Sequence, residues 1–272
     1  MKKENIIEKI TNCVNENIPI CYLKFGDGEY FCVNTQKFPE AGDRNSDNDN
    51  YTEKKQKGLI ESFKYIVNNI ENVYIGAWHT ERVTDFWESL VDKNKIKWAD
   101  YHTFIIDCDD FNKDIIDKKI KMYESIQKSQ LKKILLCNPL LKKAKELFKA
   151  DVMINVPFNN WVEIHYENIL NKIISEIKDN EQVILLTAGG MGAKILAGDI
   201  LKKFPNIILL DIGSSADFIC TKCDSRGRNY SYADIYKIFS PLLPETWHDE
   251  RYKNIYINAR QYMCCFNPYD EI

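Results

Sequence analysis

Two carboxylates stand close together near the N-terminus, in the segment Lys24-Phe25-Gly26-Asp27-Gly28-Glu29. They directly follow the apolar run 20–23, which predicts the end of a buried strand. In extended backbone, residues i and i+2 point to the same side, so Asp27 and Glu29 are expected to face one cleft. Two carboxylates at such a position suit a hard divalent cation that leaves room for substrate phosphates. Because Asp-Gly is also a common turn signal, a charged hairpin tip is the alternative interpretation.

A glycine-rich segment, Thr187-Ala188-Gly189-Gly190-Met191-Gly192, follows the apolar run 183–186 and opens a helical pattern. Glycines at this position allow a tight turn and let backbone N–H groups reach a phosphate at the N-terminus of a helix. The spacing matches neither the dinucleotide pattern G-x-G-x-x-G nor a P-loop. Phosphate binding and tight packing between strand and helix are therefore both open interpretations of this segment.

A third polar segment, Asp211-Ile212-Gly213, follows the apolar run 207–210. The acid at this strand end is a candidate for a hydrogen bond to a ribose or sugar hydroxyl, and a cap for a short helix is the alternative. The polar stretch 43–52 is interpreted as a loop that folds over the acidic pair. The chain has neither a Ser-His-Asp order nor a G-x-S-x-G elbow, which disfavours hydrolases of those kinds.

Short β-rich runs that alternate with helical patterns must position these polar segments. Strands are expected at 18–23, 73–76, 101–107, 133–137, 152–156, 182–186 and 206–210. Helices are expected at 5–14, 57–70, 82–91, 110–128, 141–148, 161–177 and 193–204.

Strand runs that are apolar at every position indicate burial on both faces. The sequence therefore predicts an α/β fold with a Rossmann-like open, mostly parallel sheet and helices on both faces, and such sheets bind ligands at the carboxyl ends of their strands. No Pro- or Gly-rich linker divides the chain, so one domain is expected over residues 1–272, with an irregular tail from about residue 241.

The overall composition narrows the functional classes. A formal net charge of −3 gives no electrostatic footprint for nucleic acid or anionic membrane. The N-terminus lacks the apolar region of a signal peptide, and the apolar runs are too short to span a bilayer, so a cytoplasmic protein is expected. The nine cysteines are then expected to be reduced thiols, several of them in the core.

Taken together, the polar segments resemble the GT-D-type glycosyltransferases, a family marked by a DxE motif. The resemblance rests on Lys24 to Glu29 and is supported by Asn155-Val156-Pro157-x-Asn159-Asn160, Leu186 to Gly190 and Leu210 to Gly213, in an order that covers roughly residues 19–217. It implies a nucleotide-diphospho-sugar donor, often a UDP-sugar, and a manganese or magnesium ion. The chain departs from its relatives at two positions, with Lys24 where they tend to have Arg and Gly190 where they often have Pro.

This resemblance gives a specific functional hypothesis. The chain is expected to be a metal-dependent hexosyltransferase that passes a sugar to a glycan or glycoprotein acceptor, with Asp27 and Glu29 as catalytic and metal-binding residues. The residues expected to bind the donor are Lys24, Gly26, Gly28, Asn160, Thr187, Gly189, Gly190, Gly192, Asp211 and Gly213. Two alternatives are an enzyme that holds S-adenosylmethionine or NAD in the glycine-rich turn, which leaves the acidic pair unexplained, and a non-catalytic sugar-nucleotide-binding protein.

Overall fold

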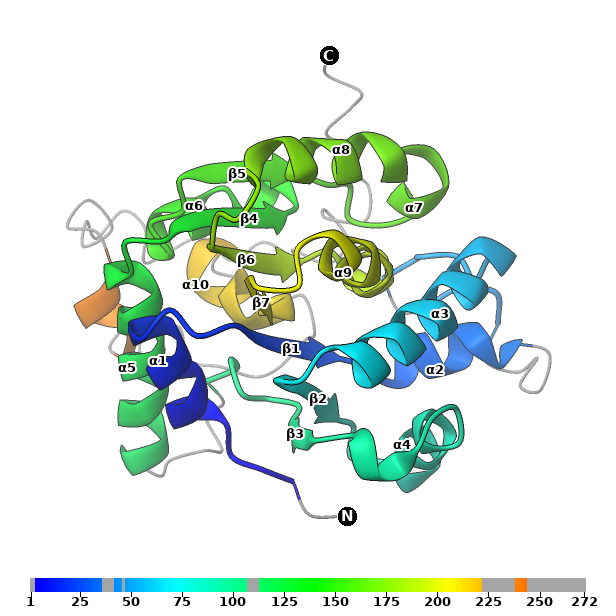
Figure 1. Ribbon diagram of the computed structural model, residues 1–272. Helices are drawn as coiled ribbons and strands as arrows, with labels where there is room; N and C mark the ends of the chain where they lie inside the picture. Colours follow the sequence, from blue (N-terminus) through cyan, green and yellow to red (C-terminus); the bar gives the residue numbers. More distant parts are fainter. Residues whose placement is uncertain (1–2, 36–41, 46, 107–112, 222–237, 244–272) are drawn as a thin grey trace.

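The computed structural model describes residues 3–35, 42–45, 47–106, 113–221 and 238–243. Within these residues seven parallel strands form one sheet in the order β3-β2-β1-β7-β6-β4-β5 (Figure 1). The strands are β1 (Ile20–Lys24), β2 (Val73–Ala77), β3 (Trp98–Asp100), β4 (Lys132–Cys137), β5 (Val152–Asn155), β6 (Val183–Ala188) and β7 (Ile208–Asp211). The predicted α/β class with an open parallel sheet is confirmed.

Helices cover both faces of the sheet, and each face has its own apolar core. One face carries α2 (Asp27–Val33), α3 (Glu53–Asn69), α4 (Glu81–Glu88), α7 (Trp161–Ile164), α8 (Tyr166–Glu176) and α9 (Gly190–Lys203). The other face carries α1 (Ile7–Asn15), α5 (Lys113–Lys128), α6 (Lys143–Leu147) and α10 (Asp217–Thr221). Strands β1, β2 and β7 are buried along their whole length, as the continuous apolar runs predict.

Two small residues bring α3 and α9 close together. A Cβ atom on Gly198 would lie 2.6 Å from Ser62 Oγ, and one on Gly58 would lie 2.8 Å from Ile195 Cγ2. The Ser62 hydroxyl also donates a hydrogen bond to the Lys194 carbonyl. This packing fixes the position of the N-terminal part of α9, which reaches the carboxyl end of the sheet.

The connections that leave the strand ends diverge to opposite faces of the sheet. The chain passes from β1 to α2 and from β6 to α9 on one face. After β4 and β7 it passes instead into the short 3₁₀ helices η4 (Pro139–Leu141) and η5 (Gly213–Ala216), whose apolar residues belong to the other core. Such divergence opens a crevice above the strand ends, which is where ligands of open α/β sheets bind.

The helix expected at 161–177 is divided into α7 and α8, and α9 begins three residues before its expected start. The structure differs from the sequence expectations at three further places. Residues 27–33 form helix α2, which the sequence analysis did not predict. The extended segment expected at 101–107 is a turn over the described residues 101–104, because the strand lies just before it at Trp98–Asp100. Helix α3 begins at Glu53, four residues before the expected start, because Thr52 accepts a hydrogen bond from the Lys55 N–H and caps it.

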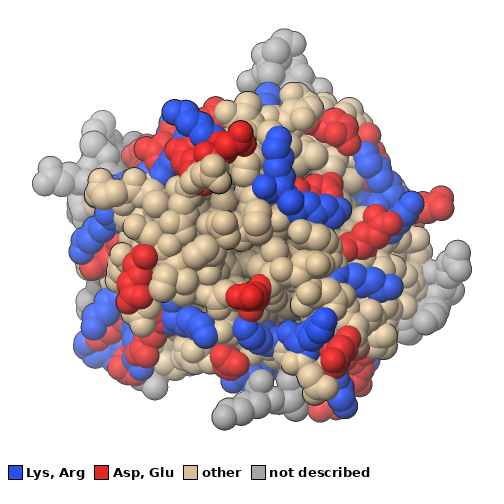
Figure 2. Space-filling model, in the orientation of Figure 1, with Lys and Arg blue, Asp and Glu red and all other residues tan. Residues whose placement is uncertain are grey.

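The remaining expectations concern the C-terminal part, the membrane and the surface charge. The irregular tail falls outside the described residues from position 244 onward, and the single-domain organisation stays a prediction. No described helix combines the length and apolar character needed to cross a membrane. On the face seen in Figure 2, acidic and basic side chains are interspersed and neither sign dominates, as expected for a chain of net charge −3.

Candidate functional site

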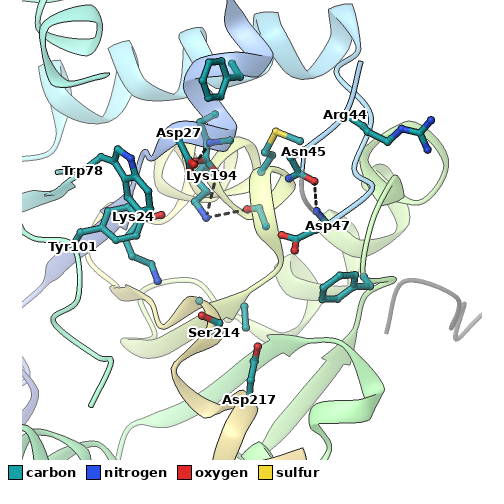
Figure 3. A pocket seen from close by; sticks show the side chains of 18 of the residues that line it. Lys24, Asp27, Arg44, Asn45, Asp47, Trp78, Tyr101, Lys194, Ser214 and Asp217 are labelled. Carbon is teal, nitrogen blue, oxygen red and sulfur yellow. Dashed lines mark hydrogen bonds and ion pairs between the residues drawn. The ribbon is translucent and has the colours of Figure 1, made fainter. Parts of the chain in front are cut away.

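A cavity of about 690 Å³ opens where the strands end, and Figure 3 shows part of its lining. Its walls come from the segments that follow all seven of the described strands, together with the loop 43–52. The charged residues of the lining are Lys24, Asp27, Glu29, Arg44, Asp47, Arg82, Lys194 and Asp217. Its aromatic residues are Phe31, Tyr51, Trp78, Tyr101, His102 and Phe158. This mixture of both charge signs and flat apolar rings suits a polar ligand that also carries a ring system.

Both acids of the predicted motif line this cavity, but not by the expected geometry. They lie in the first turn of α2, where residues two positions apart do not share a face, so the argument from extended backbone was wrong. Glu29 is buried and its Oε2 accepts a hydrogen bond from the Gly26 N–H at 2.8 Å, which caps the helix. Asp27 is exposed, and its Oδ1 accepts the Gly28 N–H at 2.9 Å. Of the two carboxylates, that of Asp27 is the one open to the cavity.

Lys194 connects three strand ends through its buried ammonium group. Its Nζ lies 3.0 Å from Asp211 Oδ2 and 3.6 Å from Glu29 Oε1, and it donates to the Gly190 carbonyl at 3.1 Å. Asp211 is fully buried, and it also accepts the backbone N–H groups of Lys24 at 3.3 Å and Gly213 at 3.0 Å. The sequence analysis assigned Lys194 no role. The available signal was a lysine inside the otherwise apolar stretch 191–198.

Glycines make room for the Lys24 side chain to reach the cavity. A Cβ atom on Gly213 would overlap Lys24 Nζ, and one on Gly76 would lie 3.1 Å from Lys24 Cγ. The Lys24 ammonium then lies 5.5 Å from the centre of the Tyr101 ring, a cation–π contact. A Cβ atom on Gly26 would approach Tyr101 Oη to 2.6 Å. These glycines therefore serve close packing around the cavity.

An aromatic wall, formed by Trp78 after β2 and Tyr101 after β3, lies beside Lys24 (Figure 3). The two rings meet edge to face with their centroids 4.6 Å apart. On α4 and α2, the Arg82 guanidinium lies 5.4 Å from the centre of the Phe31 ring. Flat rings next to fixed cations can stack a nucleobase or a sugar ring. The sequence analysis missed this wall because its residues come from separate turns.

The loop 43–52 lies at the cavity, as predicted, and is attached to α7. Asn160 accepts the Asn50 N–H at 2.9 Å and donates its own backbone N–H to Asp49 Oδ1 at 2.8 Å. Lys55 Nζ, which is fully buried, lies 2.6 Å from Asp49 Oδ1 and 3.1 Å from Glu163 Oε2. Burial raises the pKa of Asp49, although the Lys55 ammonium acts in the opposite direction. Asn160 thus holds the loop in place.

The structure separates the twelve predicted site residues into two groups. Six line the cavity: Lys24, Asp27, Gly28, Glu29, Gly190 and Gly213. The other six lie behind or beside it: Gly26, Asn160, Thr187, Gly189, Gly192 and Asp211. Among the latter, Gly192 packs against the Trp161 ring, which a Cβ atom would overlap, and Thr187 is fully buried. Donor binding by any of these residues stays a prediction.

The oxygen ligands present suit a hard cation only in part. No cluster of three His, Cys, Asp or Glu side chains with metal-site geometry occurs among the described residues. Asp27 offers an open carboxylate, whereas Glu29 is already engaged by Gly26 and Lys194. Magnesium-type ions bind through one or two carboxylates plus substrate phosphates. The site therefore fits such an ion at Asp27, provided that a substrate supplies further oxygens.

Comparisons with known proteins agree with the architecture. A model of the GT-D fold-like domain, GT-D-like, matches residues 1–219. Two solved structures align with TM-scores of 0.52 and 0.51, each at 16% identity, over 94% of this chain and 92% of the other. One is a selenomethionine-substituted structure of the domain of unknown function 1792, and the other is that highly conserved domain, described as having a distinct glycosyltransferase fold. No curated protein matches the chain.

Proposed function

This chain belongs to the GT-D-like family, and on that premise we propose that it is a glycosyltransferase of the hexosyltransferase class. The donor is a nucleotide-diphospho-sugar, with a UDP-sugar the first to test, and the acceptor is a hydroxyl group of a glycan or glycoprotein. One observation carries the proposal: a single cavity at the strand ends joins the open Asp27 carboxylate to the side chains of Lys24 and Lys194 and to an aromatic wall. These are the groups that a charged diphosphate with rings at both ends requires.

The diphosphate of the donor would lie at the N-terminus of α9, near Lys24 and Lys194. Both lysines line the cavity, and the backbone at Gly190 has a φ of +58°, with nothing within 4 Å of an added Cβ atom. A helix N-terminus favours an anion, and fixed ammonium groups in a poorly solvated site offset the charge that develops on a departing diphosphate. Trp78 and Tyr101 would stack the nucleobase or the sugar ring.

We also propose a divalent cation, manganese or magnesium, at the Asp27-Gly28-Glu29 segment. Asp27 would hold it together with oxygens of the diphosphate, with Glu29 in the buried layer behind. When bound, such an ion acts as a Lewis acid and offsets negative charge on the leaving group, an effect usually of several kcal/mol. The acceptor would approach beneath the loop 43–52, whose Arg44, Asn45 and Asp47 line the cavity.

The test is a donor screen with a matched variant. Wild type and D27N are incubated with UDP-, GDP- and dTDP-sugars, with and without Mn²⁺, and both thermal unfolding and transfer to mixed sugar acceptors are followed. We expect a sugar nucleotide plus metal to raise Tm in wild type and to give a glycosylated product by mass spectrometry, and D27N to lose the metal-dependent part. The acid Asp85 on α4, outside the cavity lining, gives the control variant D85N.

Other outcomes separate the alternatives. Stabilisation by a sugar nucleotide with neither transfer nor hydrolysis would favour a non-catalytic binding protein. Stabilisation by S-adenosylmethionine or NAD without metal would favour the other Rossmann-type enzymes and would refute the proposed transfer.

A further inference from the structure

We propose that the two acids of the motif have different functions: Asp27 is a direct metal ligand, whereas Glu29 is a positioning residue that acts through Lys194, which itself contacts the donor diphosphate. This inference rests on the proposed function and adds Lys194 to its binding residues. It also assigns Glu29 a role other than that of a second metal ligand.

The orientation of Glu29 favours this assignment. One of its carboxylate oxygens accepts the buried Gly26 N–H at 2.8 Å, and the other faces Lys194 Nζ at 3.6 Å. Turning the carboxylate toward a metal ion would leave a buried backbone donor without its acceptor and would remove an anion from a buried lysine, and both changes are costly. Asp27 is exposed at the cavity and needs no such rearrangement.

The surroundings of Lys194 fix its ammonium group at the cavity wall. It is 5% exposed, yet it belongs to the cavity lining. The Asp211 carboxylate, 3.0 Å from Nζ, accepts hydrogen bonds from the backbone N–H groups of Lys24 and Gly213. The Glu29 carboxylate accepts one from the backbone N–H of Gly26. Because each carboxylate is anchored on its other side, the pair can orient the ammonium without moving. A fixed ammonium next to the N-terminus of α9 suits a phosphate oxygen.

The network also predicts coupling between the donor site and helix α2. Lys194 lies one turn into α9, and Glu29 belongs to the same first turn of α2 as Asp27. Removal of the Glu29 carboxylate should therefore displace the Lys194 ammonium and weaken diphosphate binding. In a variant that already lacks Lys194, removal of Glu29 should cause little further loss of diphosphate affinity. The two substitutions should be strongly non-additive, as for residues in one contact network.

The test measures binding separately from turnover. Affinities for UDP without metal, and for Mn²⁺ in the presence of UDP, are determined by calorimetry and by electron paramagnetic resonance for wild type, D27N, E29Q, K194M, K194R and E29Q/K194M. Lys202, an exposed residue of the same helix that pairs with Asp199, gives the control K202M. Chemical unfolding of each variant shows whether it is folded.

We expect K194M to weaken UDP at least tenfold with or without metal, K194R to recover part of that loss, and K202M to change nothing. D27N should abolish Mn²⁺ binding and leave metal-free UDP affinity within a few fold. E29Q should keep Mn²⁺ binding, weaken UDP less than K194M does, and add nothing to K194M in the double variant.

Three outcomes would overturn the inference: loss of Mn²⁺ binding in E29Q as complete as in D27N, unchanged UDP affinity in K194M, or additive effects of the two substitutions. If K194M does not fold, K194R and E29Q decide the question by the same measurements. If wild type binds none of UDP, GDP and dTDP, the proposed function fails together with the inference, whereas a tight wild-type complex that K194M leaves intact refutes the inference alone.

Discussion

At the scale of single residues, the site depends on glycines, whose lack of a side chain leaves room for neighbouring groups. Gly213 combines a φ of +51° with a Cβ direction that points into Lys24 Nζ. We expect Gly213→Ala to destabilise the fold by about 1–3 kcal/mol through backbone strain and also to displace the Lys24 ammonium from the cavity. UDP affinity, measured by calorimetry, should fall at least tenfold. Gly42 is the matched control, since its φ is +78° and an added Cβ atom would meet nothing within 4 Å. An equal loss of UDP affinity in Gly42→Ala would show that strain alone is responsible.

The aromatic wall leads to a second prediction at this scale. Trp78 is half-buried, meets Tyr101 edge to face and lines the cavity, so its ring offers apolar surface to a ligand ring. Stacking of a base on an aromatic side chain is usually worth about 1–3 kcal/mol when measured by alanine substitution. Trp78→Ala should therefore raise the Kd for UDP roughly 5- to 150-fold, and Trp78→Phe should keep most of the affinity. Equal affinities of wild type and Trp78→Ala would place the ring of the ligand elsewhere in the cavity.

At the scale of elements, the attachment of the loop 43–52 depends on one buried lysine. Without Lys55, the carboxylate of Asp49 would remain buried and lose the ammonium group beside it, and such a loss usually costs about 3–5 kcal/mol. Lys55→Met should lower the free energy of unfolding by that amount at pH 7. Since burial already raises the pKa of Asp49 and the lysine opposes this effect, the variant should raise that pKa further.

The pH dependence of this variant follows from the direction of the shift. An acid whose pKa is raised in the folded state binds its proton more tightly there, so its contribution to stability is largest below the unfolded pKa and is lost as the pH rises through the folded value. The deficit of Lys55→Met should accordingly shrink when urea unfolding is repeated near pH 4. The double variant Lys55→Met/Asp49→Asn, which has neither charge, should show little of this pH dependence. A deficit that is constant between pH 4 and pH 7 would contradict the assignment to Asp49.

The elements also show which features could be predicted from the sequence. Strands β1, β4, β6 and β7 were predicted close to their true positions, because burial on both faces gives each a continuous apolar run within its length. Helix α2 was not predicted, since its first residues include Gly28, a poor helix former. It forms because Glu29 caps it and because Tyr30 and Cys32 pack into the core beside α3. The packing depends on tertiary contacts, and the cap depends on the orientation of the Glu29 side chain. Neither follows from the local sequence pattern.

The candidate site was predictable to the extent that it is local in sequence. Asp27 and Gly190 lie at strand ends, and the rule that ligands bind there found them. Lys194 and the aromatic wall were missed, because their positions depend on how separate turns meet in space. Asn160 was assigned to the donor from its sequence alone, and only its hydrogen bonds to the loop 43–52 reveal its structural role.

At the scale of the whole molecule, the two apolar cores enclose thiols that should report on folding. The described cysteines Cys13, Cys21, Cys32, Cys137 and Cys220 are free and buried. Burial raises the pKa of Cys32 and of Cys137 to about 12, so that only ~1 in 10,000 of either is thiolate at pH 8. Because the thiolate is the reactive form, both should resist iodoacetamide until the chain unfolds. Mass spectrometry of peptides from protein labelled with and without urea measures this, and equal labelling rates would show that the cores open readily.

The same shifts predict how stability changes in alkaline solution. A thiol whose pKa is raised by folding contributes stability that is complete below its unfolded value, near 8.5, and that is lost as the pH rises toward the folded value. Each such thiol should lower the free energy of unfolding by about 1.4 kcal/mol per pH unit above that point. The buried phenols of Tyr22, Tyr123 and Tyr166, whose pKa burial also raises, act in the same direction at higher pH. Urea unfolding should therefore give a clearly lower free energy of unfolding at pH 10 than at pH 7.5. In Cys32→Ala this decrease should be smaller by the contribution of one buried thiol. A chain that is as stable at pH 10 as at pH 7.5 would mean that these groups are not buried as the two cores require.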